Sequence, residues 1–161
     1  FQNPPFAQGK LVSVITGVVV DVAVDIRKNS ATYGQPFSVV LSGKNKTSFW
    51  IPPGFAHGFI TLEDDTIFTY KCTGVYNKES EGSIVWNDKD LKIKWPIKNP
   101  IISKKDKKNL KFNEFKKLYI ITMESIYFSK ERLTVDEPED RSVRRIFMST
   151  VKMRNYQWDA V

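Results

Sequence analysis

The residues best suited to chemistry are one histidine, one tyrosine and one lysine, each in or beside a strand-like segment. His57 closes the run Pro52-Pro53-Gly54-Phe55-Ala56-His57, in which a proline and a glycine set a tight turn before the histidine enters the next strand pointing inward. An inward histidine is either a metal ligand or a hydrogen-bonded core residue. Tyr70 lies in the alternating segment 66–73, whose interior face is predicted to carry Thr66, Phe68, Tyr70 and Cys72. Its buried hydroxyl then needs a hydrogen-bond partner.

The sequence argues against a metal site. Cys72 is the only cysteine and His57 the only histidine, so a disulfide within the chain, a Cys-rich zinc site and a three-histidine site are all excluded. The P-x-G-x-x-H run resembles the second cupin motif, whose histidine often binds a metal together with an H-x-H…E motif. Residues 1–57 contain no such motif. We therefore expect no metal at His57.

Strand signals dominate the first two thirds of the chain and predict an all-β fold. Short segments rich in valine, isoleucine and aromatic residues alternate with polar turns, a pattern typical of a sandwich or barrel. The predicted strands are 10–15, 18–26, 37–41, 48–51, 59–62 and 66–73. Residues 74–115 are irregular and predict an extended arm that wraps the barrel. Residues 116–161 change in character again, so the predicted domains are 1–115 and a tail of unknown structure, 116–161.

The first two predicted strands place charges where burial is expected. With Thr16-Gly17 as a two-residue hairpin turn, Val12 faces Asp21 and Lys10 faces Ala23. One face of this hairpin is almost entirely apolar, and the other mixes valines with Lys10, Asp21 and Asp25. Two interpretations stay open: a sandwich or barrel with a polar interior, or an ordinary sheet with one solvated face.

Net charge is concentrated in one segment. The chain of 161 residues carries a net charge of +7, and residues 89–111 hold nine lysines against two aspartates, so this segment accounts for the whole excess. Such a cluster attracts phosphates, but no aromatic stacking platform or known module accompanies it, so no nucleic-acid partner is expected. The longest apolar run, 11–20, is far shorter than the roughly 20 residues of a membrane helix. We expect a cytoplasmic protein without a membrane partner.

Several blocks together resemble the dTDP-4-dehydrorhamnose 3,5-epimerase family, in the family's order and spacing across residues 1–115. The blocks are Gln8–Val12, Asp21–Lys28, Thr32–Gly34, Ile51–Phe59, Tyr70–Thr73, Trp86–Asp88, Trp95-Pro96 and Ile102–Asp106. The resemblance implies a cupin-type jelly roll, a homodimer, no cofactor, and a dTDP-4-keto-6-deoxy sugar substrate from dTDP-L-rhamnose synthesis. It implies inversion at C3 and C5 through an enolate at O4, which needs a base, an acid on the opposite face of the ring and a donor at O4.

The resemblance also assigns roles to individual residues. Tyr70 matches the acid that delivers a proton, Lys10 the cation that neutralises charge near O4, and Asp106 the carboxylate that orients the catalytic base. Three further residues match positions that contact the substrate: His57, Glu81 and Lys105. Tyr76 matches an aromatic residue near the nucleotide base.

One departure from the family concerns the base itself. In the family it is a histidine of an R-G-L-H segment, and that histidine falls directly before Phe1. We therefore expect a domain that lacks its N-terminal part, with strand edges exposed, and little or no epimerase activity of the chain as given. The tail 116–161 matches nothing in the family, as expected of an extension or of a frameshift or fusion product.

Two other functions are kept open. A related enzyme that inverts only C3 or only C5 would use the same base and acid. A cupin that binds a nucleotide sugar without turning it over would need no base at all.

Overall fold

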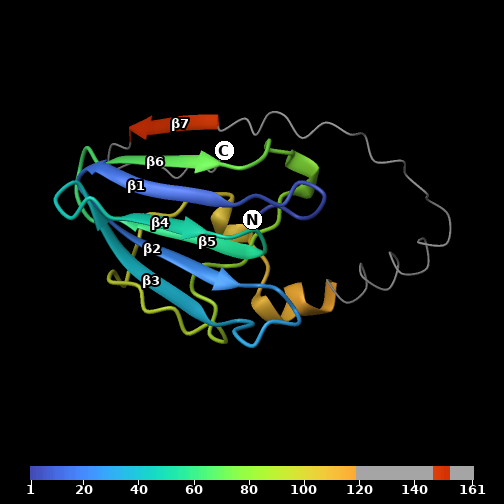
Figure 1. The fold of residues 1–161 in the computed structure, drawn as a ribbon. Coiled ribbons are helices and arrows are strands. Elements are labelled where there is room, and N and C mark those ends of the chain that lie inside the picture. Colours follow the sequence, from blue (N-terminus) through green and yellow to red (C-terminus); the bar gives the residue numbers. More distant parts are fainter. Residues whose placement is uncertain (119–146, 153–161) are drawn as a thin grey trace, which may run out of the picture.

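The computed structural model describes residues 1–118 and the backbone of residues 147–152 (Figure 1). Two antiparallel sheets form a sandwich: one has the order β4-β1-β6-β7 and the other the order β3-β2-β5. The strands are β1 (Lys10–Thr16), β2 (Val18–Asp25), β3 (Pro36–Ser42), β4 (Ser48–Ile51), β5 (Phe55–Thr61), β6 (Ile67–Cys72) and β7 (Phe147–Lys152). Two 3₁₀ turns, η1 (Lys78–Ser80) and η2 (Asp106–Lys108), lie between β6 and β7, and residues 112–118 are helical. The predicted all-β fold is confirmed.

All six predicted strands are present, and one of them begins earlier than expected. β5 begins at Phe55 rather than at residue 59, because Phe55 already pairs with Asp25 of β2. The turn before it depends on Gly54, whose φ of +84° is unfavourable for other residues. His57 therefore lies inside a strand, opposite Ala23, and its position is fixed by backbone pairing.

The predicted hairpin between the first two strands is wrong. β1 pairs with β4 and β6, so Val12 lies opposite Phe49 and Tyr70 and not opposite Asp21. β2 pairs instead with β3 and β5 in the other sheet. A single residue, Gly17 with φ +86°, separates the two strands, and it turns the chain from one sheet into the other. A Cβ at Gly17 would come within 2.2 Å of the Thr66 hydroxyl oxygen, so the corner requires glycine.

Because the chain passes from one sheet to the other at Gly17, the face of β2 that carries both apolar residues and aspartates lies in the space between the sheets. The inner core there contains Val12, Val14, Val19, Ala23, Leu41, Ile51 and Phe68. Asp21 and Asp25 share this inner face of β2 and are almost completely buried. Of the two interpretations of the charged face, a sandwich with a polar interior is therefore the correct one.

The arm covers the outer face of the β3-β2-β5 sheet, as predicted. A second core forms there from Val20, Val22, Val24, Ile26, Ile60, Leu91, Phe112 and Phe115. Asp88 ties two parts of the arm together, because its buried carboxylate accepts hydrogen bonds from the Asp90 nitrogen and the Phe112 nitrogen, both at 2.8 Å. The Val85 nitrogen also donates to the Leu110 carbonyl at 2.8 Å. These bonds hold residues 83–88 beside residues 109–112, which directly follow the η2 turn that carries the predicted Asp106.

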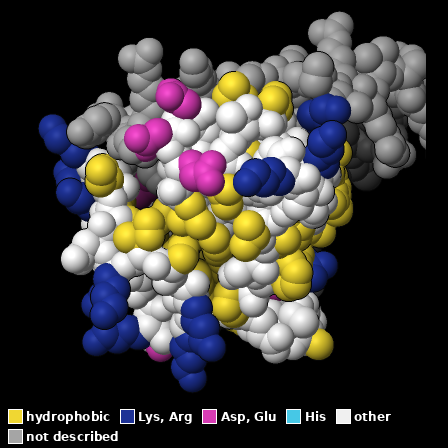
Figure 2. All heavy atoms as spheres, turned by 90° about the vertical axis from the view of Figure 1, so that its left-hand side faces the viewer, with side chains coloured by type: hydrophobic (Ala, Val, Ile, Leu, Met, Phe, Trp, Pro, Cys, Tyr) yellow, Lys and Arg dark blue, Asp and Glu magenta, His cyan; other side chains and the backbone are white. Residues whose placement is uncertain are grey.

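Large apolar side chains remain exposed to solvent at several strands of the sandwich. Phe37 and Val40 of β3 and Trp50 of β4 are each about half exposed, and Ile15 at the end of β1 is 59% exposed. Figure 2 shows apolar side chains gathered in a continuous band on one face, with Lys and Arg side chains around it. No helix in the described residues is long and apolar enough to cross a membrane.

Asp25, at the end of β2, is the centre of a hydrogen-bonded cluster in which both of its carboxylate oxygens accept bonds. Its carboxylate accepts hydrogen bonds from the Arg27 guanidinium at 2.7 and 2.9 Å and from the Ser30 and Thr32 hydroxyls, both at 2.6 Å. The bond from Arg27 is the main reason that the pKa of Asp25 lies well below its usual range. Burial opposes this shift, and Ser30 and Thr32 add to it. This cluster holds the loop between β2 and β3 in place, and Tyr33 of that loop packs against Phe112 of the arm.

We expect Asp25→Asn to lower the free energy of unfolding at pH 7 by about 2 kcal/mol, the scale of hydrogen bonds to a buried charge. Because folding lowers the pKa of Asp25, its contribution is complete above the unfolded value of 3.8 and is lost as the pH falls below it. Urea unfolding at pH 7 and pH 3 checks this: the parent chain should lose more stability in acid than the variant does. Asp64→Asn, in an exposed loop, is the matched control. An equal acid loss in the parent chain and in Asp25→Asn would contradict the assignment.

Candidate active site

His57 is held by a buried carboxylate that the sequence analysis did not assign to it. Its Nε2 lies 2.9 and 3.0 Å from the two carboxylate oxygens of Asp21, which is 0% exposed. A ring nitrogen this close to a carboxylate must carry a proton, so Nε2 is the donor. In the neutral imidazole Nδ1 then carries the lone pair, and it has no hydrogen-bond partner in the described part of the chain. The hydrogen bond expected of an inward-pointing histidine is therefore present.

The surroundings of this pair are aromatic. Phe68, almost completely buried, stacks on Phe59 with ring centroids 4.3 Å apart, and the His57 ring lies 6.1 Å from Phe59 and 6.5 Å from Phe68. These rings restrict the imidazole while Asp21 sets its tautomer. Such a group can accept a proton at Nδ1, or donate a hydrogen bond from Nδ1 when it is protonated.

Tyr70 and Lys10 lie on the inner face of the other sheet. Tyr70 has the predicted parity, because it shares its face of β6 with the buried Phe68 and packs against the inner core. Lys10 is opposite Cys72, and Val12, on the same face of β1, is opposite Tyr70. Burial raises the pKa of the Cys72 thiol, while the Lys10 ammonium acts in the opposite direction, which places that charge close to Cys72. Both predicted residues therefore face the polar interior.

Asp106 lies on the arm, held at both carboxylate oxygens. The Ser103 hydroxyl donates to Oδ2 at 2.7 Å, and the Asn109 amide donates to Oδ1 at 3.3 Å. The Asp106 nitrogen in turn donates to the Ser103 hydroxyl at 3.0 Å. His57 does not reach it, since that imidazole is bonded to Asp21. The carboxylate of Asp106 is held instead by Ser103 and Asn109 of the arm.

The three remaining predicted residues form one cluster. Glu81 accepts hydrogen bonds from the Tyr76 hydroxyl at 2.8 Å and from the Lys105 ammonium. Partial burial would raise the pKa of Glu81, but the bonds from Lys105 and Tyr76 outweigh it and lower the pKa. The same bonds raise the pKa of Lys105 and the pKa of Tyr76. Tyr76 and Lys105 come from distant parts of the arm, and their shared bonds to Glu81 bring a phenol and an ammonium group close together.

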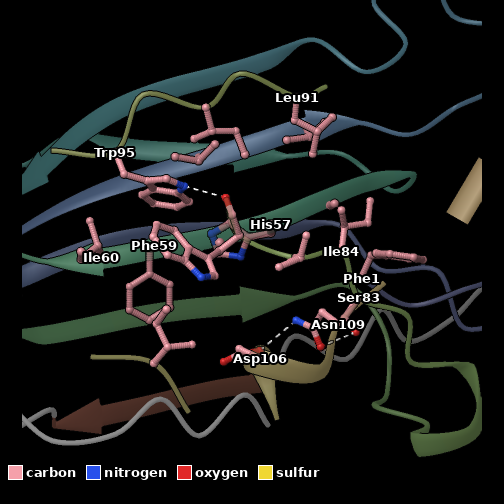
Figure 3. Close-up of a pocket in the computed structure, with 18 of the residues that line it drawn as sticks. Phe1, His57, Phe59, Ile60, Ser83, Ile84, Leu91, Trp95, Asp106 and Asn109 are labelled. Carbon is pink, nitrogen blue, oxygen red and sulfur yellow. Dashed lines mark hydrogen bonds between the residues drawn. The ribbon is translucent and has the colours of Figure 1, made fainter. Parts of the chain in front are cut away.

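A cavity of about 160 Å³ lies between His57 and the predicted residues of the arm. Four of the seven line it: His57, Glu81, Lys105 and Asp106. Its walls are otherwise mainly apolar, with Val22, Ile60, Leu91 and Trp95 among them. Figure 3 shows His57 in the middle of the pocket, with Trp95 on one side and the Asp106–Asn109 turn on the other. Lys10, Tyr70 and Tyr76 are not among the lining residues; Tyr76 reaches the pocket through Glu81.

Sequence reasoning missed Asp21, Ser83 and Asn109. A signal existed for Asp21, because a charged residue recurs on an otherwise apolar face of a valine-rich strand, but the wrong hairpin paired it with Val12. Ser83 and Asn109 gave no signal, since a serine and an asparagine in an irregular arm look like ordinary turn residues. In the described residues, no group of three or more His, Cys, Asp or Glu side chains gathers as metal ligands do.

Fold and site together define a cupin-type sandwich with an Asp-held histidine at an arm-covered pocket. The model of the dTDP-4-dehydrorhamnose 3,5-epimerase family matches residues 1–114. A Shigella flexneri dTDP-4-dehydrorhamnose 3,5-epimerase is 51% identical over 112 residues, which cover 70% of this chain and 62% of that relative. The chain therefore belongs to the dTDP-4-dehydrorhamnose 3,5-epimerase family.

Solved structures agree with this assignment. The crystal structure of the Elizabethkingia anophelis enzyme has a TM-score of 0.69 and 49% identity, covering 70% of this chain and 63% of that one. The enzyme from Legionella pneumophila, solved in complex with dTDP-4-keto-L-rhamnose, has a TM-score of 0.67 and 50% identity, covering 70% and 60%. The chain spans about three fifths of the length of these relatives.

Proposed function

We propose that this chain carries part of an epimerase site that inverts C3 and C5 of a dTDP-4-keto-6-deoxy sugar. Its residues donate hydrogen bonds to the sugar O4 and return a proton to the ring. The observation that carries the proposal is the His57–Asp21 pair, which fixes an imidazole at a pocket that Asp106 also lines. A 4-keto sugar becomes acidic at C3 and C5 because the carbanion delocalises into an enolate at O4. Preorganised donors at that oxygen supply much of the catalysis in such reactions.

The residues divide the reaction among them. His57 and the Lys10 ammonium stabilise the negative charge that develops on O4. Tyr70 returns a proton to the face of the ring opposite the base, and its phenol is suited to this because the proton acceptor is a carbanion. The Tyr76–Glu81–Lys105 cluster binds the nucleotide part, with Lys105 near a phosphate and Tyr76 near the base. The lysine-rich arm attracts the same diphosphate.

Asp106 is proposed to orient the base. Residues 1–3 pair antiparallel with residues 80–82: the Phe1 nitrogen and carbonyl both bond to Gly82 at 3.0 Å, and Gln2 pairs with Glu81. In an antiparallel pair, a residue joined ahead of Phe1 lies opposite Ser83. That position is beside the turn that carries Asp106. The histidine of the family's R-G-L-H segment would therefore reach the Asp106 carboxylate.

Four further predictions belong to this proposal: the homodimer, the dTDP-sugar ligand, the absence of a cofactor and the cytoplasmic location. The homodimer is supported by the apolar band of Figure 2, and the dTDP-sugar ligand by what the Legionella relative binds. The absence of a cofactor and a cytoplasmic location stay predictions. Inversion at one carbon only would use the same residues, so the reaction products decide between one and two inversions.

The proposal is tested by exchange of the C3 and C5 protons of the 4-keto nucleotide sugar for deuterium. We expect exchange at both carbons when a relative's N-terminal segment, with its histidine, precedes Phe1. Binding of the nucleotide sugar with no exchange at either carbon in that chain would instead support a cupin that binds without catalysis.

A further inference from the structure

The Asp106 carboxylate belongs to a hydrogen-bonded relay whose outer members are unassigned. The Ser83 hydroxyl donates to Asn109 Oδ1 at 2.8 Å, and Asn109 Nδ2 donates to Asp106 Oδ1 at 3.3 Å (Figure 3). All three side chains are partly buried and line the pocket. Ser83 and Asn109 are 26 residues apart in sequence, so only the folded arm brings them together.

The relay has a direction that its chemistry enforces. A side-chain amide has one accepting and one donating end, and a carboxylate only accepts. If the Asn109 amide were turned over, its oxygen would face an Asp106 oxygen, and two acceptors would repel. Ser83 reinforces the observed orientation by donating to Oδ1. The acceptor-only carboxylate therefore fixes the orientation of the Asn109 amide, and the serine hydroxyl, which can donate or accept, completes the chain by donating to Oδ1.

Asn109 adds a restraint that Ser103 cannot provide alone. Ser103 bonds to Oδ2, whereas Asn109 bonds to Oδ1, so the carboxylate is held at both oxygens. The terminal torsion of an aspartate is otherwise broad. Ser103 is also local to the turn, while Asn109 connects the turn to residues 83–85, where Ile84 pairs with Leu110. Lys105 and Glu81 tie the other end of the same turn to the same segment.

We propose that Ser83 and Asn109 are positioning residues that fix the plane of the Asp106 carboxylate at the pocket. The inference rests on the proposed function only in giving that carboxylate the task of orienting a base. The base would lie opposite Ser83. Through Asn109, the same Ser83 also fixes the orientation of the Asp106 carboxylate that the base would contact. The two partners of the base–carboxylate pair are thus aligned by one piece of backbone.

The test follows the Asn109 side-chain amide in the ¹⁵N-labelled 161-residue chain by NMR. Asp106→Ala, which removes the accepting oxygen, and Ser83→Ala should each speed the exchange of its protons with water about three- to tenfold, the effect of one lost hydrogen bond. Ser83→Thr, which keeps the hydroxyl, should restore slow exchange and shows that Ser83→Ala acts through the hydrogen bond. Asn113→Ala, an exposed position in the same arm, is the matched control.

Unchanged Asn109 exchange in Ser83→Ala, with the melting temperature preserved, would overturn the relay. So would slow exchange that survives in Asp106→Ala. The measurement contains no substrate. If the chain preceded by a relative's N-terminal segment fails to turn over the nucleotide sugar, that failure contradicts the proposed function and leaves this result untouched.

Discussion

Tyr70→Phe is expected to abolish inversion while retaining part of the deuterium exchange, in a chain that carries the N-terminal segment of the Shigella flexneri relative ahead of Phe1. The base can still remove the C3 and C5 protons and return deuterium to the same face. Without the hydroxyl, no acid is left on the opposite face. A positioned acid contributes about 10²–10⁴-fold, which is the expected loss of inversion rate. The ring still packs on Phe68, so the fold should be preserved.

The readout is the ratio of inverted product to deuterium incorporated, measured by NMR. Tyr33→Phe is the matched control, because Tyr33 packs on Phe112 of the arm and not in the sandwich interior. Inversion at the same rate in Tyr70→Phe and in the parent would remove Tyr70 from the mechanism.

Asp21→Ala is expected to affect stability and chemistry together. The substitution leaves the His57 Nε2 proton without its acceptor in a site where Asp21 is 0% exposed. An orphaned buried donor and a lost charge-assisted bond together lower the free energy of unfolding by about 3 kcal/mol. The imidazole also loses its fixed tautomer, so exchange by the extended chain should fall by about 10²-fold or more.

Asp21→Asn separates the two effects. Its amide oxygen can still accept the Nε2 proton, so most of the stability should return, but the negative charge beside the imidazole is gone. Urea unfolding and deuterium exchange are measured on both variants, with Asp90→Ala, an exposed site, as the control. If Asp21→Ala unfolds within about 0.5 kcal/mol of the parent, a change typical of surface positions, the pair does not stabilise the fold.

The sequence predicted strands and parities better than it predicted partners. Alternation alone placed Tyr70 beside Phe68 on the interior, because side-chain parity is a property of a single strand. The assignment of β1 and β2 to different sheets was not predictable from their sequences: Thr16-Gly17 suits a hairpin turn, and the crossing depends on Thr66 and on the strands that arrive later.

The site shows the same division between local and distant information. His57 was found from its turn, but its partner Asp21 is 36 residues away, and strand pairing decides that contact. Tyr76, Glu81 and Lys105 were chosen by family resemblance, and the fold shows that they touch. The relay from Ser83 to Asp106 forms only after the arm folds back on itself. Contacts between distant residues therefore had to come from the structure.

Deuterium exchange at C3 and C5 of the 4-keto nucleotide sugar tests the central claim most directly, with two chains compared at equal binding saturation. The 161-residue chain alone should bind the sugar and exchange at a rate close to the enzyme-free control. The same chain preceded by the relative's segment should exchange and invert at both carbons, and Lys10→Met and Asp106→Asn should each slow it. Exchange by the 161-residue chain alone at the rate of the extended chain would contradict the account, because it would show that the base is already among the residues described here.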